Sequence, residues 1–220
     1  MNSMYETIMD LPLFKGIGED QLSQMLEKTK MEFLKFEDGE VICRMDENVE
    51  SLNFILNGRV KLTYRMNNFP IEIDEIRNKN SVIGALHLFG MNTSYNSVST
   101  AIGKVSIMRI GKSQYMNILK SDSIYMLNFL NYLSAAAQKT PDFLMDSKGY
   151  SIGRTLETLA FSIVSKRSET VMVAGEDQVL ADYCGVTLQE FEEWKISELA
   201  HNRVIVNQRG IFLKSPHLLR

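Results

Sequence analysis

The hydrophobic periodicity of the sequence changes once, at Gly111, and this change limits the folds that are open to the chain. From Phe33 to Ile110 apolar residues recur at a period near two, in short runs that turn residues separate, which is typical of strands. Beyond Gly111 they recur at steps of three and four, which is typical of helices. Many short strands followed by helices predict an α+β chain whose first half is a small roll or barrel.

Strand-like segments and turns alternate through this first half. The segments are 40–43, 53–56, 59–64, 71–76 and 105–110. The turns are expected at 37–39, 57–58, 67–70 and 78–80, where Asn, Asp, Gly and Pro gather. Asn57 and Gly58 both tolerate the positive φ of a tight turn, so this pair predicts a β-hairpin. Short helices between Leu13 and Leu34 are expected as an N-terminal cover.

A single long helix is expected from Ser113 to Lys139. Its apolar seam consists of Met126, Leu130, Leu133 and Ala137. These residues are four and three positions apart, which suits a dimer interface against a second copy of the chain. Alternatively, the helix packs on its own domain. Thr140 and Pro141 suit an N-cap and a first-turn proline, so the helix is expected to break and restart there. Residues 147–151 are the expected domain boundary.

The stretch from Leu180 to Trp194 has the pattern of two helices that cross at a tight turn. Ala181 is small where the second helix crosses, and Gly185 can take the left-handed conformation that ends the first helix. Thr187 and Glu190 form a capping-box pair that starts the second helix. The apolar wedge between the helices consists of Leu180, Cys184, Val186, Phe191 and Trp194. A helix over 152–164 and a short strand over 169–174 are expected before them.

A second hairpin is expected after these helices. The apolar runs 204–206 and 211–213 flank Asn207-Gln208-Arg209-Gly210, which predicts two short strands around a turn, in the position of a wing. Arg209 at the tip is either a contact to a DNA phosphate or a solvated arginine.

Length, composition and charge set further limits. A chain of 220 residues with 45% hydrophobic and 23% charged residues has the composition of two soluble domains. No apolar run or N-terminal signal of a membrane or secreted protein is visible, so a cytoplasmic protein is expected. Cys43 and Cys184 are too few for a four-cysteine cluster. The net charge of −3, with nine basic and nine acidic residues across 147–220, gives no global signature of nucleic-acid binding.

The order of these parts resembles the Crp/Fnr family of bacterial transcription regulators. The segments 38–42 and 54–62 match the β-roll pattern of that family, and 180–199 with the wing matches its helix-turn-helix. The resemblance implies a cyclic-nucleotide-binding-like β-roll (jelly roll) sensor over 1–112, a connecting and dimerisation helix over 113–146, and a winged helix-turn-helix domain over 147–220.

The family also implies a function and partners. It implies a homodimer that binds a palindromic operator in double-stranded DNA, regulates transcription and has RNA polymerase as a further partner. No phosphate loop of the G-x-x-x-x-G-K type, H-E-x-x-H pair or G-x-S-x-G elbow is present, so the protein is not expected to be an enzyme.

The sensor half departs from the cyclic-nucleotide binders of this family. In them a Gly-Glu-Leu segment and a later Arg-Ser hold the ribose and the cyclic phosphate, whereas this chain has Gly84-Ala85-Leu86 and Asn96-Ser97. Loss of both charged groups argues against cyclic AMP or cyclic GMP as the effector. The roll is expected to bind another small molecule, with His87, Asn96 and Ser97 as polar contacts, or to be an empty structural domain. His87 as a heme ligand is the remaining alternative, and no cofactor is expected.

The second helix departs from the family as well. Relatives place Arg, Glu and Arg on its exposed face to contact DNA. The matching positions here are Leu188, Gln189 and Glu193, and Thr187 at the helix start is a further predicted DNA-binding residue. Gln189 could contact an adenine edge and Leu188 a thymine methyl. The predicted phosphate contacts are Lys166, Arg167, Lys195, Arg203, Arg209 and Lys214. The acidic side chains of Glu190, Glu192 and Glu193 leave a second hypothesis open, a ligand-responsive or protein-binding module without specific DNA binding.

Overall fold

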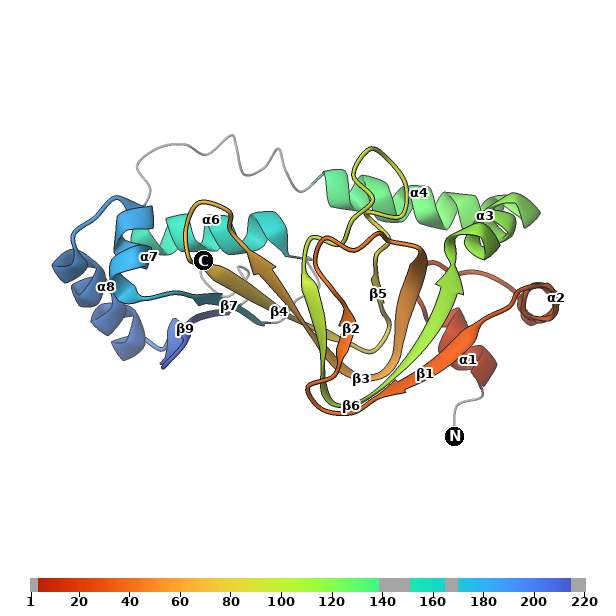
Figure 1. The fold of residues 1–220 in the computed structure, drawn as a ribbon, viewed down its shortest axis with the longest axis horizontal. Helices are drawn as coiled ribbons and strands as arrows, with labels where there is room; N and C mark the ends of the chain where they lie inside the picture. The colour runs from red at the N-terminus through yellow and green to blue at the C-terminus, as the bar shows by residue number, and fades with distance from the viewer. Residues whose placement is uncertain (1–3, 139–150, 165–169, 215–220) are drawn as a thin grey trace. The chain divides into compact units, whose positions relative to one another are not determined.

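A computed structural model describes residues 4–138, 151–164 and 170–214 (Figure 1). The chain divides into two compact units, the first formed by residues 1–60 and 77–138 and the second by residues 61–76 and 139–220. The expected helix break at Thr140-Pro141 and most of the expected boundary at 147–151 lie outside the described residues. Within the described residues, no helix combines the length and apolar character needed to cross a membrane.

The first unit is an antiparallel roll. β1 (Glu32–Phe36) and β2 (Val41–Cys43) both pair with β6 (Val98–Gly111), and β5 (Ser81–Ile83) pairs with β3 (Ser51–Arg65). β3 also lies beside β6. Figure 1 shows these strands wound around one another, which confirms the predicted β-roll.

β3 is one continuous strand, so the hairpin predicted at Asn57-Gly58 is wrong. Gly58 does have a positive φ of 87°. A Cβ on this residue would lie 2.4 Å from the carbonyl oxygen of Lys104 on the neighbouring strand. The glycine therefore permits a close backbone approach within the sheet instead of a chain reversal. The reversal comes later, at the predicted turn between β3 and β4 (Glu72–Asn78).

Helices precede and follow the strands of the first unit. They are α1 (Met4–Met9), α2 (Glu19–Lys28), α3 (Lys112–Ser121) and α4 (Ser123–Ala137). The single long helix expected from Ser113 is thus two helices, because Asp122 has an extended backbone and its Oδ1 accepts a hydrogen bond of 2.9 Å from Ile124 N. An aspartate in this position caps a new helix and ends the preceding one.

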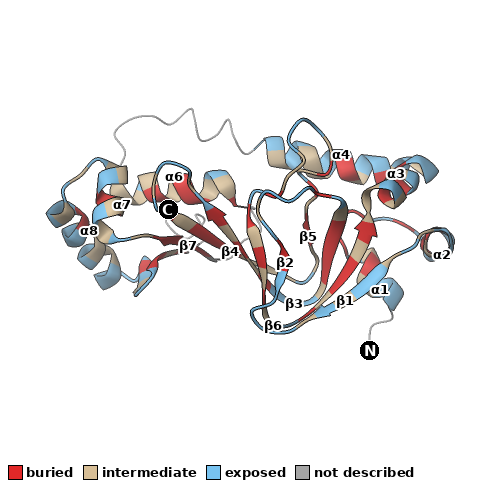
Figure 2. Ribbon diagram, viewed as in Figure 1, coloured by how far each residue is buried: buried red, intermediate tan, exposed pale blue. Residues whose placement is uncertain are grey.

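An aromatic cluster holds the helices on the roll. The ring of Phe14 lies 5.3 Å from that of Phe54 and 6.1 Å from that of Tyr125, and Tyr115 lies 5.6 Å from Phe129. One face of α4 is thereby buried, as Figure 2 shows, while Met126, Leu127 and Leu130 are exposed.

The second unit combines three helices with antiparallel strands that follow the end of β3 in the sheet. The helices are α6 (Ile152–Ile163), α7 (Asp177–Cys184) and α8 (Leu188–Ala200), and the strands are β4, β7 (Thr170–Ala174), β9 (Gly210–Lys214) and β8 (Val204–Asn207), in this order. The predicted helix over 152–164, the strand before α7 and the hairpin around 207–210 are confirmed. The pairing of Glu72–Glu75 with Val171–Ala174 was not predicted. It makes residues from the first half of the sequence part of this sheet.

Candidate nucleic-acid interface and effector region

A tight turn joins α7 to α8. Gly185 has φ 71° and ψ 31°, the left-handed conformation predicted for it, and Val186 N donates to Ala181 O at 3.1 Å. Of the predicted apolar wedge, Leu180 and Phe191 are buried, as is Ala181, while Cys184, Val186 and Trp194 are half-buried. Small and apolar residues at these positions allow the two helices to cross closely.

A reciprocal cap starts α8. Thr187 Oγ1 accepts from Glu190 N at 3.3 Å, and a carboxylate oxygen of Glu190 accepts from both Thr187 N and Thr187 Oγ1 at 2.8 Å. The backbone N–H of Thr187, and next its hydroxyl, hold the pKa of Glu190 below its usual value. This carboxylate is therefore fixed at the helix start and contributes less to an acidic reading face than the sequence suggests.

The residues predicted to face DNA from the second helix, Leu188, Gln189 and Glu193, lie on the first turns of α8. Gln189 and Glu193 are exposed, Leu188 is half-buried, and Thr187 is the cap. Gln189 Nε2 donates to Glu193 Oε1 at 2.9 Å, one helical turn away. This bond uses one of the two amide N–H groups of Gln189, and the other N–H and the amide oxygen are left for a base.

The predicted phosphate contacts that the structure describes are all paired within the chain. Lys195 forms an ion pair with Asp177, and only 16% of its side chain is exposed. Arg203 Nε lies 3.0 Å from Glu198 Oε2. Lys166, Arg167 and the side chain of Lys214 lie outside the described residues. Lys195 and Arg203 are therefore each matched by a neighbouring carboxylate.

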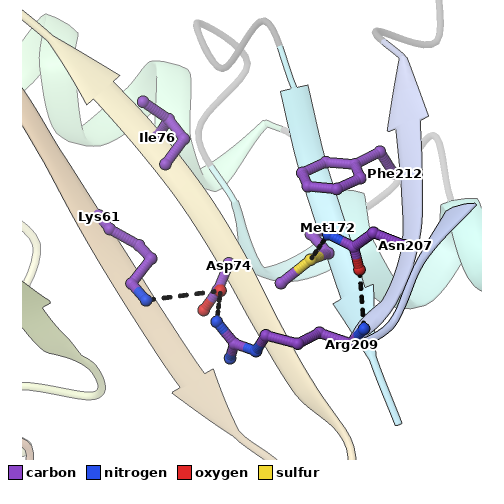
Figure 3. Close-up of a pocket in the computed structure, with 7 residues that line it drawn as sticks. All are labelled: Lys61, Asp74, Ile76, Met172, Asn207, Arg209 and Phe212. Carbon is purple, nitrogen blue, oxygen red and sulfur yellow. Dashed lines mark hydrogen bonds and ion pairs between the residues drawn. The ribbon is translucent and has the colours of Figure 1, made fainter. Parts of the chain in front are cut away.

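Arg209 at the β8–β9 turn pairs with two carboxylates of β4, of which Figure 3 shows Asp74. Its Nη1 lies 3.6 Å from Asp74 Oδ2, and its Nη2 lies 3.5 Å from Glu72 Oε2. Asp74 also receives a 2.6 Å hydrogen bond from Thr63 Oγ1 and lies 3.8 Å from Lys61 Nζ. A cavity of about 190 Å³ adjoins this cluster and is lined by Lys61, Asp74, Ile76, Met172, Asn207, Arg209 and Phe212.

Sequence reasoning missed the acidic partners in this cluster. Lys61, Thr63 and Arg65 alternate along β3, and Glu72 and Asp74 alternate along β4, so that each set shares one strand face. This alternation was the available signal. It could not reveal Arg209 as a partner, because that contact depends on the pairing of β4 with β7.

The predicted effector residues lie between β5 and β6 in the first unit. Gly84 has φ 93°, and a Cβ there would meet Val49 at 3.0 Å and the ring of Tyr95 at 3.4 Å. The structure therefore brings the segment that begins at Gly84 next to the one that ends at Asn96-Ser97. The predicted residues differ in exposure: Ala85 and Ser97 are buried, Gly84 and His87 are half-buried, and Leu86 and Asn96 are exposed.

A polar network lies beside this segment. Asn53, which is fully buried, donates to Tyr95 OH at 3.2 Å and to Cys43 Sγ at 3.5 Å, and accepts 2.8 Å from Arg109 Nε. Burial raises the pKa of the Cys43 thiol and that of the Tyr95 hydroxyl. Ser99 Oγ, on the residue paired with Cys43, is buried without a hydrogen-bond partner among the described residues. The roll thus has a polar interior beside the predicted effector segment.

The two cysteines show no grouping with other metal-binding side chains in the part of the chain that the structure describes. Both are free thiols, and among the described residues no three His, Cys, Asp or Glu side chains are grouped so that they could hold a metal ion.

Residues 33–122 match the family model of the cyclic nucleotide-binding domain. No curated protein matches the chain.

Solved structures share the fold at low sequence identity. The catabolite activator protein of Thermus thermophilus is 14% identical with a TM-score of 0.53, over 94% of this chain and 96% of that one. The sensor domain of the transcriptional regulator DNR from Pseudomonas aeruginosa is 17% identical with a TM-score of 0.53, over 66% of this chain and 94% of that one. FixK2 from Bradyrhizobium japonicum is 13% identical with a TM-score of 0.50, over 86% and 95% of the two chains. Residues 33–122 are thus a cyclic nucleotide-binding domain, and the chain shares its fold with the catabolite activator protein.

Proposed function

We propose that the protein is a DNA-binding transcription regulator of the Crp/Fnr type. The observation that carries this proposal is the order of parts in one chain, a cyclic nucleotide-binding domain followed by α7, the Gly185 turn, α8 and the β8–β9 hairpin. Two helices that cross at such a turn, followed by a two-stranded hairpin, form a winged helix-turn-helix. In this arrangement α8 enters the major groove and the hairpin follows the phosphate backbone. Two of the similar structures are named as an activator protein and as part of a transcriptional regulator, which supports the same role.

The proposed effector is a small molecule other than cyclic AMP. Ala85, where cyclic-nucleotide binders have a glutamate, is buried and carries no charge, and Asn96 carries an amide where they have an arginine. The guanidinium of Arg109, which has no carboxylate partner among the described residues, could replace that charge from β6. Gly84, Leu86, His87 and Ser97 complete the proposed pocket.

The proposed active form is a cytoplasmic homodimer. The exposed side chains of Met126 and Leu130 on α4, with Leu133 and Ala137, would form the contact between two copies. A dimer would present two α8 helices to the two halves of a palindromic operator, and RNA polymerase would be the further partner. Binding of the effector would shift the dimer between two arrangements of its DNA-binding domains.

Fluorescence anisotropy tests this function directly. The purified chain is titrated into labelled duplex from its own upstream region and into a random duplex of equal length, at low and at physiological salt. We expect tighter binding to the upstream duplex, and a loss of that preference in Gln189→Ala, because a base contact carries sequence information that phosphate contacts lack. Lack of binding to either duplex at low salt, with and without a metabolite extract, would contradict the proposal.

A protein-binding module is the second candidate function. The observation that favours it is the pairing of Lys195, Arg203 and Arg209 with carboxylates, together with the exposed Glu192 and Glu193 on α8. Such a surface repels phosphates and suits a basic partner. Binding of neither duplex, with the fold intact by circular dichroism, would favour this candidate.

A further inference from the structure

We propose that Glu72 and Asp74 hold the wing arginine in the place of a DNA phosphate, so that the β3–β4 hairpin and DNA compete for Arg209. This inference rests on the proposed DNA binding. It adds a competition within one chain. This competition sets the fraction of molecules in which Arg209 is free to bind a DNA phosphate.

The arginine is held through both of its terminal nitrogens. Nη1 lies 3.6 Å from Asp74 (Figure 3). Nη2 lies 3.5 Å from Glu72, and 52% of the arginine side chain is exposed. Carboxylates and phosphates use the same chemistry towards a guanidinium, two oxygens against two N–H groups. Ion pairs at these distances on an exposed side chain are weak and screened by salt, so a phosphate can displace them.

Each carboxylate keeps a partner when the arginine leaves. Asp74, which is only 4% exposed, retains the 2.6 Å hydrogen bond from Thr63 Oγ1 and the nearby Lys61 Nζ. Glu72 retains Arg65 Nε at 2.9 Å. Removing the only partner of a buried charge is costly, and here that cost does not arise. The exchange of Arg209 between hairpin and DNA is therefore reversible.

The wing keeps its shape independently of these ion pairs. Asn207 Oδ1 accepts from Arg209 N at 2.8 Å and from Gly210 N at 3.1 Å, so the side chain of Asn207 holds the backbone of the turn. The side chain of Arg209 can thus turn from Asp74 to a phosphate without unfolding of the wing. Because β3 and β4 continue into residues of the first unit, a displacement of β4 on effector binding would change the hold on the arginine.

The test uses random duplex, because a phosphate contact does not depend on base sequence. We compare the full-length chain with Glu72→Gln/Asp74→Asn, with Arg209→Ala and with the triple variant, by anisotropy at salt concentrations from roughly 50 to 200 mM. We expect the carboxylate variant to bind about 3- to 10-fold tighter than wild type, as two weak ion pairs no longer compete. In the Arg209→Ala background, the same two substitutions are expected to change the affinity for DNA little. Arg209→Ala itself is expected to lower the slope of log affinity against log salt concentration by about one unit relative to wild type.

A matched control separates this competition from a change in total charge. Glu176→Gln/Asp182→Asn alters the charge of the second unit equally, at exposed residues that do not pair with Arg209. An equal gain in that control, or a gain that persists without Arg209, would overturn the competition and leave the proposed function standing. Lack of DNA binding by every variant would overturn both. Glu72→Gln alone, at a less buried carboxylate, gives the same comparison if the double variant fails to fold.

Discussion

Thr187 and Glu190 cap each other at the start of α8: Glu190 N donates to Thr187 Oγ1 at 3.3 Å, and Thr187 N and Thr187 Oγ1 each donate to the Glu190 carboxylate at 2.8 Å. Thr187→Ala is expected to lower the free energy of unfolding by about 1 kcal/mol, because the helix loses its cap, while Thr187→Ser keeps most of it. Urea unfolding at neutral pH measures the difference. Equal stability of the alanine and serine variants would contradict this account of the cap.

The same pair gives stability a pH dependence with a defined sign. Because the pKa of Glu190 is lowered on folding, its contribution is present above the ordinary carboxyl pKa of 4.5 and is lost as the pH falls through the lowered value. The difference between wild type and Thr187→Ala should therefore shrink in acid. Unfolding curves from neutral pH into the acid range check this, and a constant difference would argue against the ionised cap.

Gly58 and Gly39 form a matched pair for backbone strain. Both have positive φ, but a Cβ on Gly58 would meet Lys104 O at 2.4 Å, whereas one on Gly39 meets nothing within 4 Å. Gly58→Ala is expected to cost about 3 kcal/mol, since the neighbouring strand must move, and Gly39→Ala about 1 kcal/mol. Denaturant unfolding of both variants measures the gap. Equal losses of stability in the two variants would show that the close approach of Gly58 to β6 does not add to the cost of the substitution.

Two buried tyrosines should respond differently to loss of the hydroxyl. Tyr115 OH has no hydrogen-bond partner among the described residues, whereas Tyr95 OH accepts from Asn53 and donates to Ser51 O. Tyr115→Phe is therefore expected to be neutral or to stabilise by about 1 kcal/mol, and Tyr95→Phe to destabilise by about that amount. Thermal unfolding distinguishes the two, and a destabilised Tyr115→Phe would indicate a partner for that hydroxyl.

The proposed dimer makes a prediction on α4. Leu130 is 50% exposed on the predicted seam, and Ala135 is exposed on the same helix but outside the seam. Leu130→Glu is expected to convert dimer to monomer, because two like charges would face each other in an apolar contact, and Ala135→Glu is expected to leave the dimer intact. Light scattering on a sizing column gives the masses. A monomeric wild type would contradict the proposal that these residues of α4 form a dimer contact.

Both thiols should react slowly in the folded protein. Burial raises the pKa of Cys184 to about 11 and also raises that of Cys43. Only the thiolate is nucleophilic, so alkylation near neutral pH is expected to be slow until urea exposes both residues. Mass spectrometry after timed iodoacetamide treatment follows each site, and rapid native labelling of Cys43 would indicate a reactive cysteine in the roll.

Local patterns predicted the elements better than their connections. The Gly185 turn and the Thr187 cap follow from a few neighbouring residues, and both are confirmed. The Asn57-Gly58 pair is compatible both with a hairpin turn and with a continuous strand that approaches a neighbouring strand closely. Only the position of β6, which is distant in sequence, decides between the two. The polar partners of Arg209 and of Asn53 lie far away in sequence, so side-chain periodicity could not assign them.

The sheet of the second unit has a consequence for how the chain can fold. Its strand β4 is synthesised about a hundred residues before its partner β7, a separation of the kind that slows folding because the loop must close first. A fragment that began after the first unit would leave one edge of β7 unpaired, and such edges recruit strands from other chains. No single cut in the chain therefore separates the two units.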